Sequence, residues 1–284
     1  MNLMHYIRFV NDKIHVLLYG EHKEDVYINS RLAKHINAVY DEDGDERKKW
    51  THIFIASDPL WLNLQDIDVE MNGKFLGNVK KTIVGARKRL VAMTMVALYD
   101  IPLIPAYVEY NSRLGVEHFY IYINDSITNV QLPELEHVSY IEWKYPYYNE
   151  NKIHCAQMMA ITDFLYFAKH ISDYILYTDV DEFIESTRID LSNNKLCYVF
   201  LNKFVQLNNV VPFLESIDPI IKKNFTEDSE IFEYKRRSKC IVSSSISNMN
   251  IHYMYDPPSD SENTEIVGNF FHVRNFHNRR HVSV

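Results

Sequence analysis

The chain has 284 residues, of which 46% are hydrophobic and 24% are charged, and its formal net charge is −8 at pH 7. Glycine and proline together number only 7 + 9 = 16 residues, so collagen-like, mucin-like and disordered compositions are excluded. The acidic balance repels the phosphate backbone of a nucleic acid, so we expect no nucleic-acid partner.

Residues 1–85 predict a β-rich segment packed on the core, because short apolar runs alternate there with polar turns. Asp41, Asp43 and Asp45 imitate the start of a calcium loop, but Glu46 stands where such a loop requires glycine, so we expect a solvated turn. The predicted strands are Tyr6–Val10, Ile14–Tyr19, Asp25–Ile28 and Ile53–Ser57.

Residues 86–284 show a different pattern, which predicts one α/β domain. Leu90–Leu98 is a continuous apolar run, typical of a strand that is buried on both faces of a parallel sheet. Apolar residues at helical spacing follow from Leu103 to Leu114, and His118–Ile123 then reads as a strand. The later predicted elements are a strand at Val138–Trp143, a helix at Asn151–His170 and a strand at Tyr174–Thr178.

The cysteines and the apolar segments bear on the compartment. The cysteines are widely spaced and form no C-x-x-C pair, which favours buried or free thiols over a zinc site. Charged residues interrupt the apolar N-terminal stretch, and Asp100, Pro102 and Pro105 interrupt the richest apolar run. We therefore expect no signal peptide, no transmembrane segment and a cytoplasmic location. The cysteines are Cys155, Cys197 and Cys240.

The most informative motif is the acidic group that ends the last predicted strand. Asp179, Asp181 and Glu182 follow an apolar strand directly, and the chain then turns apolar again. Carboxylates next to a core need neutralisation, and a divalent cation such as Mg²⁺ or Mn²⁺ supplies it while leaving coordination positions for phosphate. The alternative is a strand end that is neutralised by salt bridges.

Three segments together resemble glycosyltransferase family 92 and its relatives of the GT-A fold. The first segment is Ala106–Tyr110, the second is Leu114–Tyr122, and the third is Asp179–Ile184. The similarity spans residues 90–185 well and the tail loosely, and residues 1–85 add almost nothing to it. Their order along the chain is much more specific than any single segment.

The resemblance implies a GT-A, Rossmann-like mixed sheet with helices on both faces. It also implies metal-dependent transfer of a sugar from a nucleotide-sugar donor, with a UDP-sugar and inversion expected, to a glycan or a protein-linked sugar. By resemblance, Asp179, Asp181 and His272 hold Mn²⁺ or Mg²⁺. The positions that by resemblance contact the nucleotide and its diphosphate are Ala97, Leu98, Asn124, Asp125 and Lys239.

Several residues are candidates for stabilising the leaving diphosphate or for taking the proton of the acceptor. Arg236 or Arg237 can join Lys239 in stabilising the leaving diphosphate. An inverting transferase needs a carboxylate that takes the proton of the acceptor hydroxyl. That base is not assigned by the sequence, and the residues considered for it are Glu182 beside the acidic pair and Asp218, Glu227, Asp228 and Glu230 further along.

Some positions depart from the family pattern. Asn111 stands where the helix motif of the family usually has histidine, and Ala106 stands where it often has tryptophan. After the first strand, Leu98–Asp100 replaces the family's usual Asn-Glu. Donor recognition is therefore expected to differ.

A haloacid-dehalogenase-like phosphatase also places D-x-D after a strand, although Phe183 stands where it would carry Thr or Val. A non-catalytic sugar-binding domain is the other alternative.

Overall fold

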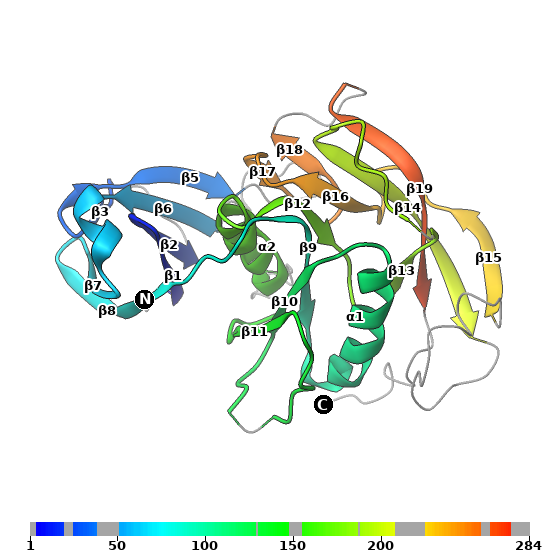
Figure 1. Ribbon diagram of the computed structural model, residues 1–284, viewed down its shortest axis with the longest axis horizontal. Coiled ribbons are helices and arrows are strands. Elements are labelled where there is room, and N and C mark those ends of the chain that lie inside the picture. The colour runs from blue at the N-terminus through cyan, green and yellow to red at the C-terminus, as the bar shows by residue number, and fades with distance from the viewer. Residues whose placement is uncertain are drawn as a thin grey trace.

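The computed structural model describes most of the chain as two large sheets, a two-stranded sheet and a few helices (Figure 1). It describes residues 4–19, 25–38, 51–128, 130–147, 155–186, 188–207, 225–256 and 262–273. The predicted turn at Asp41, Asp43 and Asp45 lies outside these ranges.

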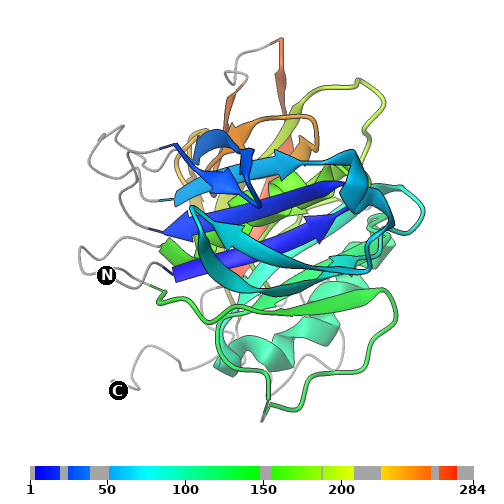
Figure 2. The same ribbon diagram turned by 90° about the vertical axis from the view of Figure 1, so that its left-hand side faces the viewer.

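The first sheet is formed by the N-terminal segment and has eight strands, of which β1 and β8 are parallel and the other neighbours antiparallel. Its own core is aliphatic and aromatic, with Phe9, Phe54 and Trp61 as the largest side chains. Figure 2 views this sheet from its outer side. In spatial order the strands are β4 (Arg31–Leu32), β3 (Tyr27–Ile28), β7 (Asp66–Met71), β8 (Lys74–Thr82), β1 (Met4–Val10), β2 (Lys13–Tyr19), β6 (Thr51–Ser57) and β5 (Lys34–Ala38), with the 3₁₀ helix η2 (Pro59–Asn63) after β6.

The sequence analysis missed the hairpin of β7 and β8. Its turn is Asn72–Gly73, with φ angles of 50° and 76°. Asn and Gly tolerate this left-handed conformation, and an Asn-Gly pair between two strands is a strong hairpin signal. The predicted strands of the segment, by contrast, are present as β1, β2, β3 and β6.

The second sheet is mixed and carries the predicted α/β pattern. Its first four strands in spatial order are mutually parallel, so their carboxyl ends share one edge. In spatial order the strands are β11 (Val138–Glu142), β10 (His118–Ile123), β9 (Lys88–Val96), β12 (Ser172–Tyr177), β16 (Lys239–Ser243), β14 (Cys197–Leu207), β19 (Thr264–Val273) and β13 (Glu182–Ile184), with β15 (Phe225–Ile231) paired to β14. The remaining elements are the 3₁₀ helix η3 (Leu98–Leu103), helices α1 (Ile104–Arg113) and α2 (Cys155–Ala168), and the small pair β17 (Asn248–Met249) and β18 (Met254–Asp256).

The mixed α/β class predicted for this part of the chain is confirmed, with small shifts of the boundaries. Strand β9 ends at Val96 instead of Leu98, because the chain turns into η3 where Leu98 is exposed. Helix α2 begins at Cys155, and the residues just before it lie outside the described ranges. Cys197 and Cys240 are buried thiols, as the cysteine spacing predicts.

Alternate residues of β9 belong to two different hydrophobic cores. Leu90, Ala92 and Val96 pack with residues of α1, whereas Val91 and Met93 pack with residues of α2. Strand β9 therefore lies between the two helices, which follows from the alternation of side chains along a strand.

The N-terminal sheet packs against α2, which lies between the two large sheets (Figure 1). Val10, Leu17 and Ile53 share one apolar core with α2. Within that contact, the guanidinium of Arg8 donates to both carboxylate oxygens of Asp163 on α2, at 3.2 and 2.5 Å. In the described ranges, none of the helices combines the length and the apolar character needed to cross a membrane.

Candidate functional site

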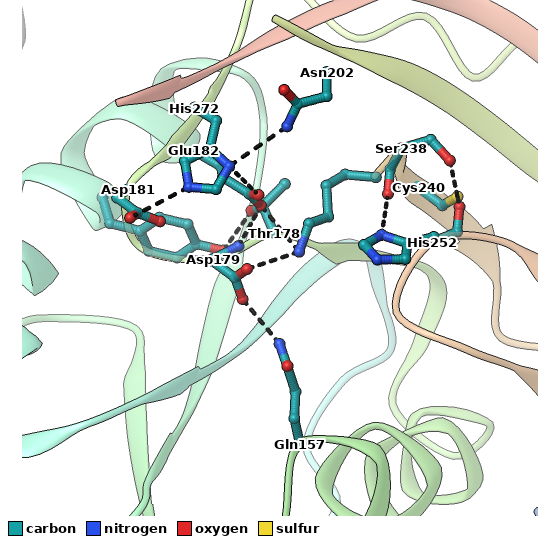
Figure 3. A network of polar contacts seen from close by, with 12 residues as sticks. Gln157, Thr178, Asp179, Asp181, Glu182, Asn202, Ser238, Cys240, His252 and His272 are labelled. Atoms are coloured by element: carbon teal, nitrogen blue, oxygen red, sulfur yellow. Dashed lines mark hydrogen bonds and ion pairs between the residues drawn. The ribbon is translucent and has the colours of Figure 1, made fainter. Parts of the chain in front are cut away.

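The acidic loop, residues 178–182, leaves the carboxyl end of β12 in the middle of the second sheet (Figure 3). Glu182 begins β13, which pairs antiparallel with β19, and the register places Glu182 opposite His272. Lys239 begins β16, which pairs with β12, so it lies beside the same loop. The sheet thus brings together an acidic motif, a lysine and a histidine that are distant in the sequence.

Asp179 is held by the protein at both carboxylate oxygens. Lys239 Nζ lies 2.8 Å from Oδ2, and Gln157 Nε2 on α2 donates to Oδ1 at 3.0 Å (Figure 3). Burial acts to raise the pKa of Asp179, but the charge and hydrogen bond of Lys239 outweigh it, so the pKa is lowered. Asp179 is therefore an ionised and firmly oriented carboxylate.

Glu182 is buried and contacts Asp179, Lys239 and His272. Its Oε2 accepts the backbone N–H of Asp179 at 2.8 Å and lies 3.1 Å from Lys239 Nζ, while its Oε1 lies 3.5 Å from Nδ1 of His272. The side chain is only 2% exposed, and its burial raises its pKa. A carboxylate so enclosed can orient its neighbours but has little access to an acceptor hydroxyl.

Asp181 and His272 form the accessible part of the site. His272 Nε2 lies 3.7 Å from Asp181 Oδ2, too far for a hydrogen bond, and the two side chains are 22% and 26% exposed for His272 and Asp181. Burial raises the pKa of Asp181 to about 6, with Glu182 and Asp179 adding to the rise. Burial also lowers the pKa of His272, which favours the neutral imidazole that a metal requires.

This group brings carboxylates and an imidazole together at one edge of the sheet. Asp179, Asp181 and Glu182 supply three carboxylates, and Lys239 is their one cationic contact when His272 is neutral. Among the described residues, no group of three or more His, Cys, Asp or Glu side chains is placed so that it could hold a metal ion. Mg²⁺ is commonly bound through one or two carboxylates together with substrate phosphates, so Asp181, with His272 beside it, is the residue that could take part in holding such an ion.

The residues expected to contact the nucleotide lie on the same edge of the sheet. Ala97 and Leu98 follow β9, and Asn124 and Asp125 follow the parallel strand β10. Asn124 donates from Nδ2 to the carbonyls of Trp143 and Tyr145, at 3.0 and 2.8 Å, so its amide group braces the chain after β11. Asp125 is exposed and Leu98 is 38% exposed, so both are accessible to a ligand.

The candidate bases beyond the acidic loop receive no structural support here. Asp218 lies outside the described residues, and Asp228, Glu227 and Glu230 lie in β15 with side chains that are also outside them. Lys239, for which a diphosphate contact is expected, is only 4% exposed and is in contact with Asp179 and Glu182.

The structure adds three residues that sequence reasoning missed. Gln157 is one of the few polar residues of a mostly apolar helix, the others being Thr162 and Asp163, which is a usable signal. Tyr107 on α1 shares a hydrogen bond of 3.0 Å with Thr178 at the start of the loop. The side chain of Asn202 lies 3.4 Å from His272 Nδ1, and no sequence signal identifies it.

Comparison with known proteins was made on this basis. The profile described as glycosyltransferase family 92 matches residues 100–283, which include the acidic loop, Lys239 and His272. No curated protein matches the chain. Among solved structures, a siderophore-interacting protein from Acinetobacter baumannii is 15% identical with a TM-score of 0.15, over 52% of this chain and 69% of that one, which is too low to inform the fold. The profile covers well over half of the sequence, and the chain belongs to glycosyltransferase family 92.

Proposed function

We propose that this protein transfers a sugar from a nucleotide-sugar donor, with a UDP-sugar as the first choice, to a hydroxyl of a glycan or protein-linked sugar, with inversion. The observation that carries the proposal is the convergence of Asp179, Asp181 and Glu182 with Lys239 and His272 at the carboxyl edge of the sheet. Such an edge is where open α/β sheets bind ligands. Family membership supports the transferase class over a phosphatase.

The fold proposed for residues 86–284 is GT-A, with residues 1–85 as a separate β-rich segment packed on it. Four parallel strands deliver their carboxyl ends to one edge, and the acidic loop emerges between β9 and β16. Helices α1 and α2 pack against alternate residues of β9, as a sheet covered on both faces requires. These features support GT-A.

In the proposed site, Asp181 and His272 would hold Mn²⁺ or Mg²⁺, and Asp179, oriented by Lys239 and Gln157, would add negative charge beside them. A bound divalent ion supplies charge stabilisation to the diphosphate as it leaves. Glu182 contacts His272 Nδ1, Lys239 and the backbone of Asp179, so we assign it a positioning role.

The donor diphosphate would lie over this edge, between the acidic loop and the ends of β9 and β10. Ala97, Leu98 and Asp125 line that edge and are proposed to contact the nucleoside. A small pocket beside Asp179 is lined by residues of β9, β12 and α2, including Thr94 and Gln157. Thr94 Oγ1 is buried in it without a hydrogen-bond partner among the described residues.

The test is a screen of nucleotide sugars by thermal shift, with Mn²⁺ or with a chelator. We expect one donor to raise the melting temperature only when Mn²⁺ is present, since a ligand stabilises the native state by RT ln(1 + [L]/Kd). Asp181→Asn should abolish that shift, whereas Asp66→Asn, an exposed carboxylate of the first sheet, should preserve it. An unchanged Mn²⁺-dependent shift in Asp181→Asn would refute the ion site.

Turnover is tested separately. With donor and Mn²⁺ but no acceptor, slow release of the nucleoside diphosphate is expected, as water takes the place of the hydroxyl. Binding of the donor with no hydrolysis and no transfer to any acceptor would instead support a non-catalytic sugar-binding domain.

A further inference from the structure

The turn between β15 and β16 carries a cluster of cations beside the acidic loop. Lys235, Arg236 and Arg237 are consecutive and exposed, and the turn ends at Ser238, directly before Lys239. Because β16 is antiparallel to β12, these residues lie next to the carboxyl end of β12. We call residues 234–238 the basic turn.

Aromatic rings connect the two arginines to His272. Arg237 Cζ lies 5.5 Å from the ring centroid of Phe204, and that ring lies 4.9 Å from the ring of His272. Arg236 Cζ lies 5.1 Å from the ring of Phe232, which meets Phe204 edge-on at 5.3 Å. Stacking on an aromatic face restricts a guanidinium while its N–H edge stays available to an anion.

The backbone of the basic turn is held in an unfavourable conformation. Lys235 and Arg237 have φ angles of 72° and 61°, in the left-handed region that residues with long side chains rarely occupy. Ser238 fastens the turn, because its Oγ donates to the carbonyl of His252 at 2.7 Å and accepts the N–H of Lys235 at 3.3 Å. Strain of this kind persists only where the surroundings enforce it, and it is concentrated at functional sites.

The arginines of the basic turn are not used for an ion pair in the described structure. Within the ranges that the structure describes, neither guanidinium contacts a carboxylate, although the whole chain has a net charge of −8. An acidic protein that keeps two adjacent arginines unneutralised next to a proposed substrate site has a local field that attracts anions.

We infer that Arg236 and Arg237 bind a phosphate group of a substrate beside Asp181 and His272. The inference rests on the proposed function and adds to that function a group that the substrate must carry. Guanidinium groups match phosphate oxygens with paired N–H donors, which lysine cannot do. The phosphate belongs either to the donor diphosphate or to an acceptor that is itself phosphorylated.

The experiment compares the double variant Arg236→Gln/Arg237→Gln with the wild type by calorimetric titration. The probes are UDP, uridine and inorganic pyrophosphate with Mg²⁺, and inorganic phosphate with UDP already bound. Arg89→Gln is the matched control, since Arg89 is exposed at the amino end of β9, away from the site. Arg236→Lys/Arg237→Lys keeps the charge but removes the paired donors, and circular dichroism checks the fold of every variant.

If the donor is the source, affinity for UDP and pyrophosphate falls about tenfold or more in the Gln variant, less in the Lys variant, and affinity for uridine is unchanged. If the acceptor is the source, UDP affinity is retained and the binding of phosphate to the UDP complex is lost. Unchanged affinity for all phosphate probes would overturn the inference. Failure of the wild type to bind UDP would count against the nucleotide donor, whereas the pyrophosphate titration would still decide the role of the arginines.

Discussion

Lys239 balances the charge of the acidic loop from inside the protein. It is 4% exposed, and its ammonium group contacts Asp179 at 2.8 Å and Glu182 at 3.1 Å. Burial acts to lower the pKa of Lys239, but the two carboxylates more than compensate, so the pKa is raised and the lysine stays charged. This explains how two acidic side chains tolerate a position next to the core.

Removing that ammonium should destabilise the fold. We expect Lys239→Met to lower the free energy of unfolding by about 3 to 5 kcal/mol, because it leaves buried carboxylates without a partner. Urea denaturation at neutral pH measures this change. Lys74→Met, at an exposed lysine of β8, is the control and should have a much smaller effect. Equal losses in both variants would contradict the assignment of Lys239 as the internal counter-ion.

Sequence reasoning proposed the acidic loop, His272 and Lys239 as site residues, and their roles stay predictions, but it could not foresee the contacts that join them. Asp179 and Asp181 stand out because charge follows an apolar strand, and that signal is local. The contacts of Lys239 and Gln157 with Asp179 depend on the pairing of β16 with β12 and on the position of α2. Such contacts across long sequence separations leave no periodic trace in the chain.

Helix α2 is an element that contacts both sheets, and a buried ion pair anchors it. The side chains of Arg8 and Asp163 are 7% and 4% exposed, and Tyr122 donates its hydroxyl proton to Asp163 at 2.5 Å. Arg8 Cζ also lies 4.3 Å from the ring of Phe167 on the same helix. The pair therefore joins β1, β10 and α2 at one point.

Removing Arg8 alone should reduce the free energy of unfolding more than replacing both Arg8 and Asp163 by apolar residues. We expect Arg8→Met to reduce the free energy of unfolding by about 3 to 5 kcal/mol, since Asp163 is left buried and unpaired. The double variant Arg8→Met/Asp163→Leu should recover most of that loss, because two apolar side chains replace the two charges. A double-mutant cycle in urea measures both, and strictly additive losses would contradict the direct pairing.

His15 on β2 should make the free energy of unfolding depend on pH through the contact between the first sheet and α2. Its ring is buried, with no hydrogen-bond partner for either nitrogen among the described residues, and it lies 6.1 Å from the ring of His170. Burial lowers the pKa of His15 to about 3, with the charge of His170 adding to the effect. The unfolded chain takes up a proton below about pH 6.5, whereas the native state does not, so the neutral ring favours folding above that pH.

The stability that depends on neutral His15 should be lost as the pH falls from about 6.5 toward 3. In that window the loss approaches about 1.4 kcal/mol per pH unit for this one group. We expect His15→Gln to show a shallower decline of unfolding free energy than the wild type between about pH 7 and pH 5. His137→Asn, at an exposed histidine with a left-handed φ angle that Asn tolerates, should decline as the wild type does. Parallel curves for His15→Gln and the wild type would exclude this contribution.

The elements that sequence reasoning placed are those with a strong period of their own. Strand β10 was predicted at its observed bounds, and α1 within one residue at each end, because aromatic and β-branched residues mark the strand and apolar residues recur at helical spacing in the helix. The pairing of β14 with β19 was beyond prediction, since the paired residues are 67 or 68 positions apart in the sequence and no short turn sets their register. The hairpin at Asn72–Gly73 was predictable from its turn residues alone.

At the scale of the whole molecule, the two sheets depend on one another although the family profile covers only residues 100–283. Val10, Leu17 and Ile53 of the first sheet share a core with α2, and the ring of Tyr6 lies 4.9 Å from that of Trp143. A chain that begins at residue 86 would expose this apolar surface of α2 and leave Asp163 without its arginine. The first sheet also has a core of its own, around Phe9 and Phe54, so the apolar core that it shares with α2 is what argues against independent folding.

We therefore expect residues 86–284 alone to be insoluble or to lack fixed tertiary packing, and the full chain to unfold in one cooperative transition. Near-ultraviolet circular dichroism and calorimetry on both chains measure this, with coincident transitions by the two methods as the sign of a single unit. Co-expression of residues 1–85 as a separate chain should rescue the solubility of residues 86–284, because the contact is non-covalent. A truncated chain that keeps the melting temperature of the full protein would show instead that the first sheet is an independent appendage, and the anchoring role of Arg8 would then have to be abandoned.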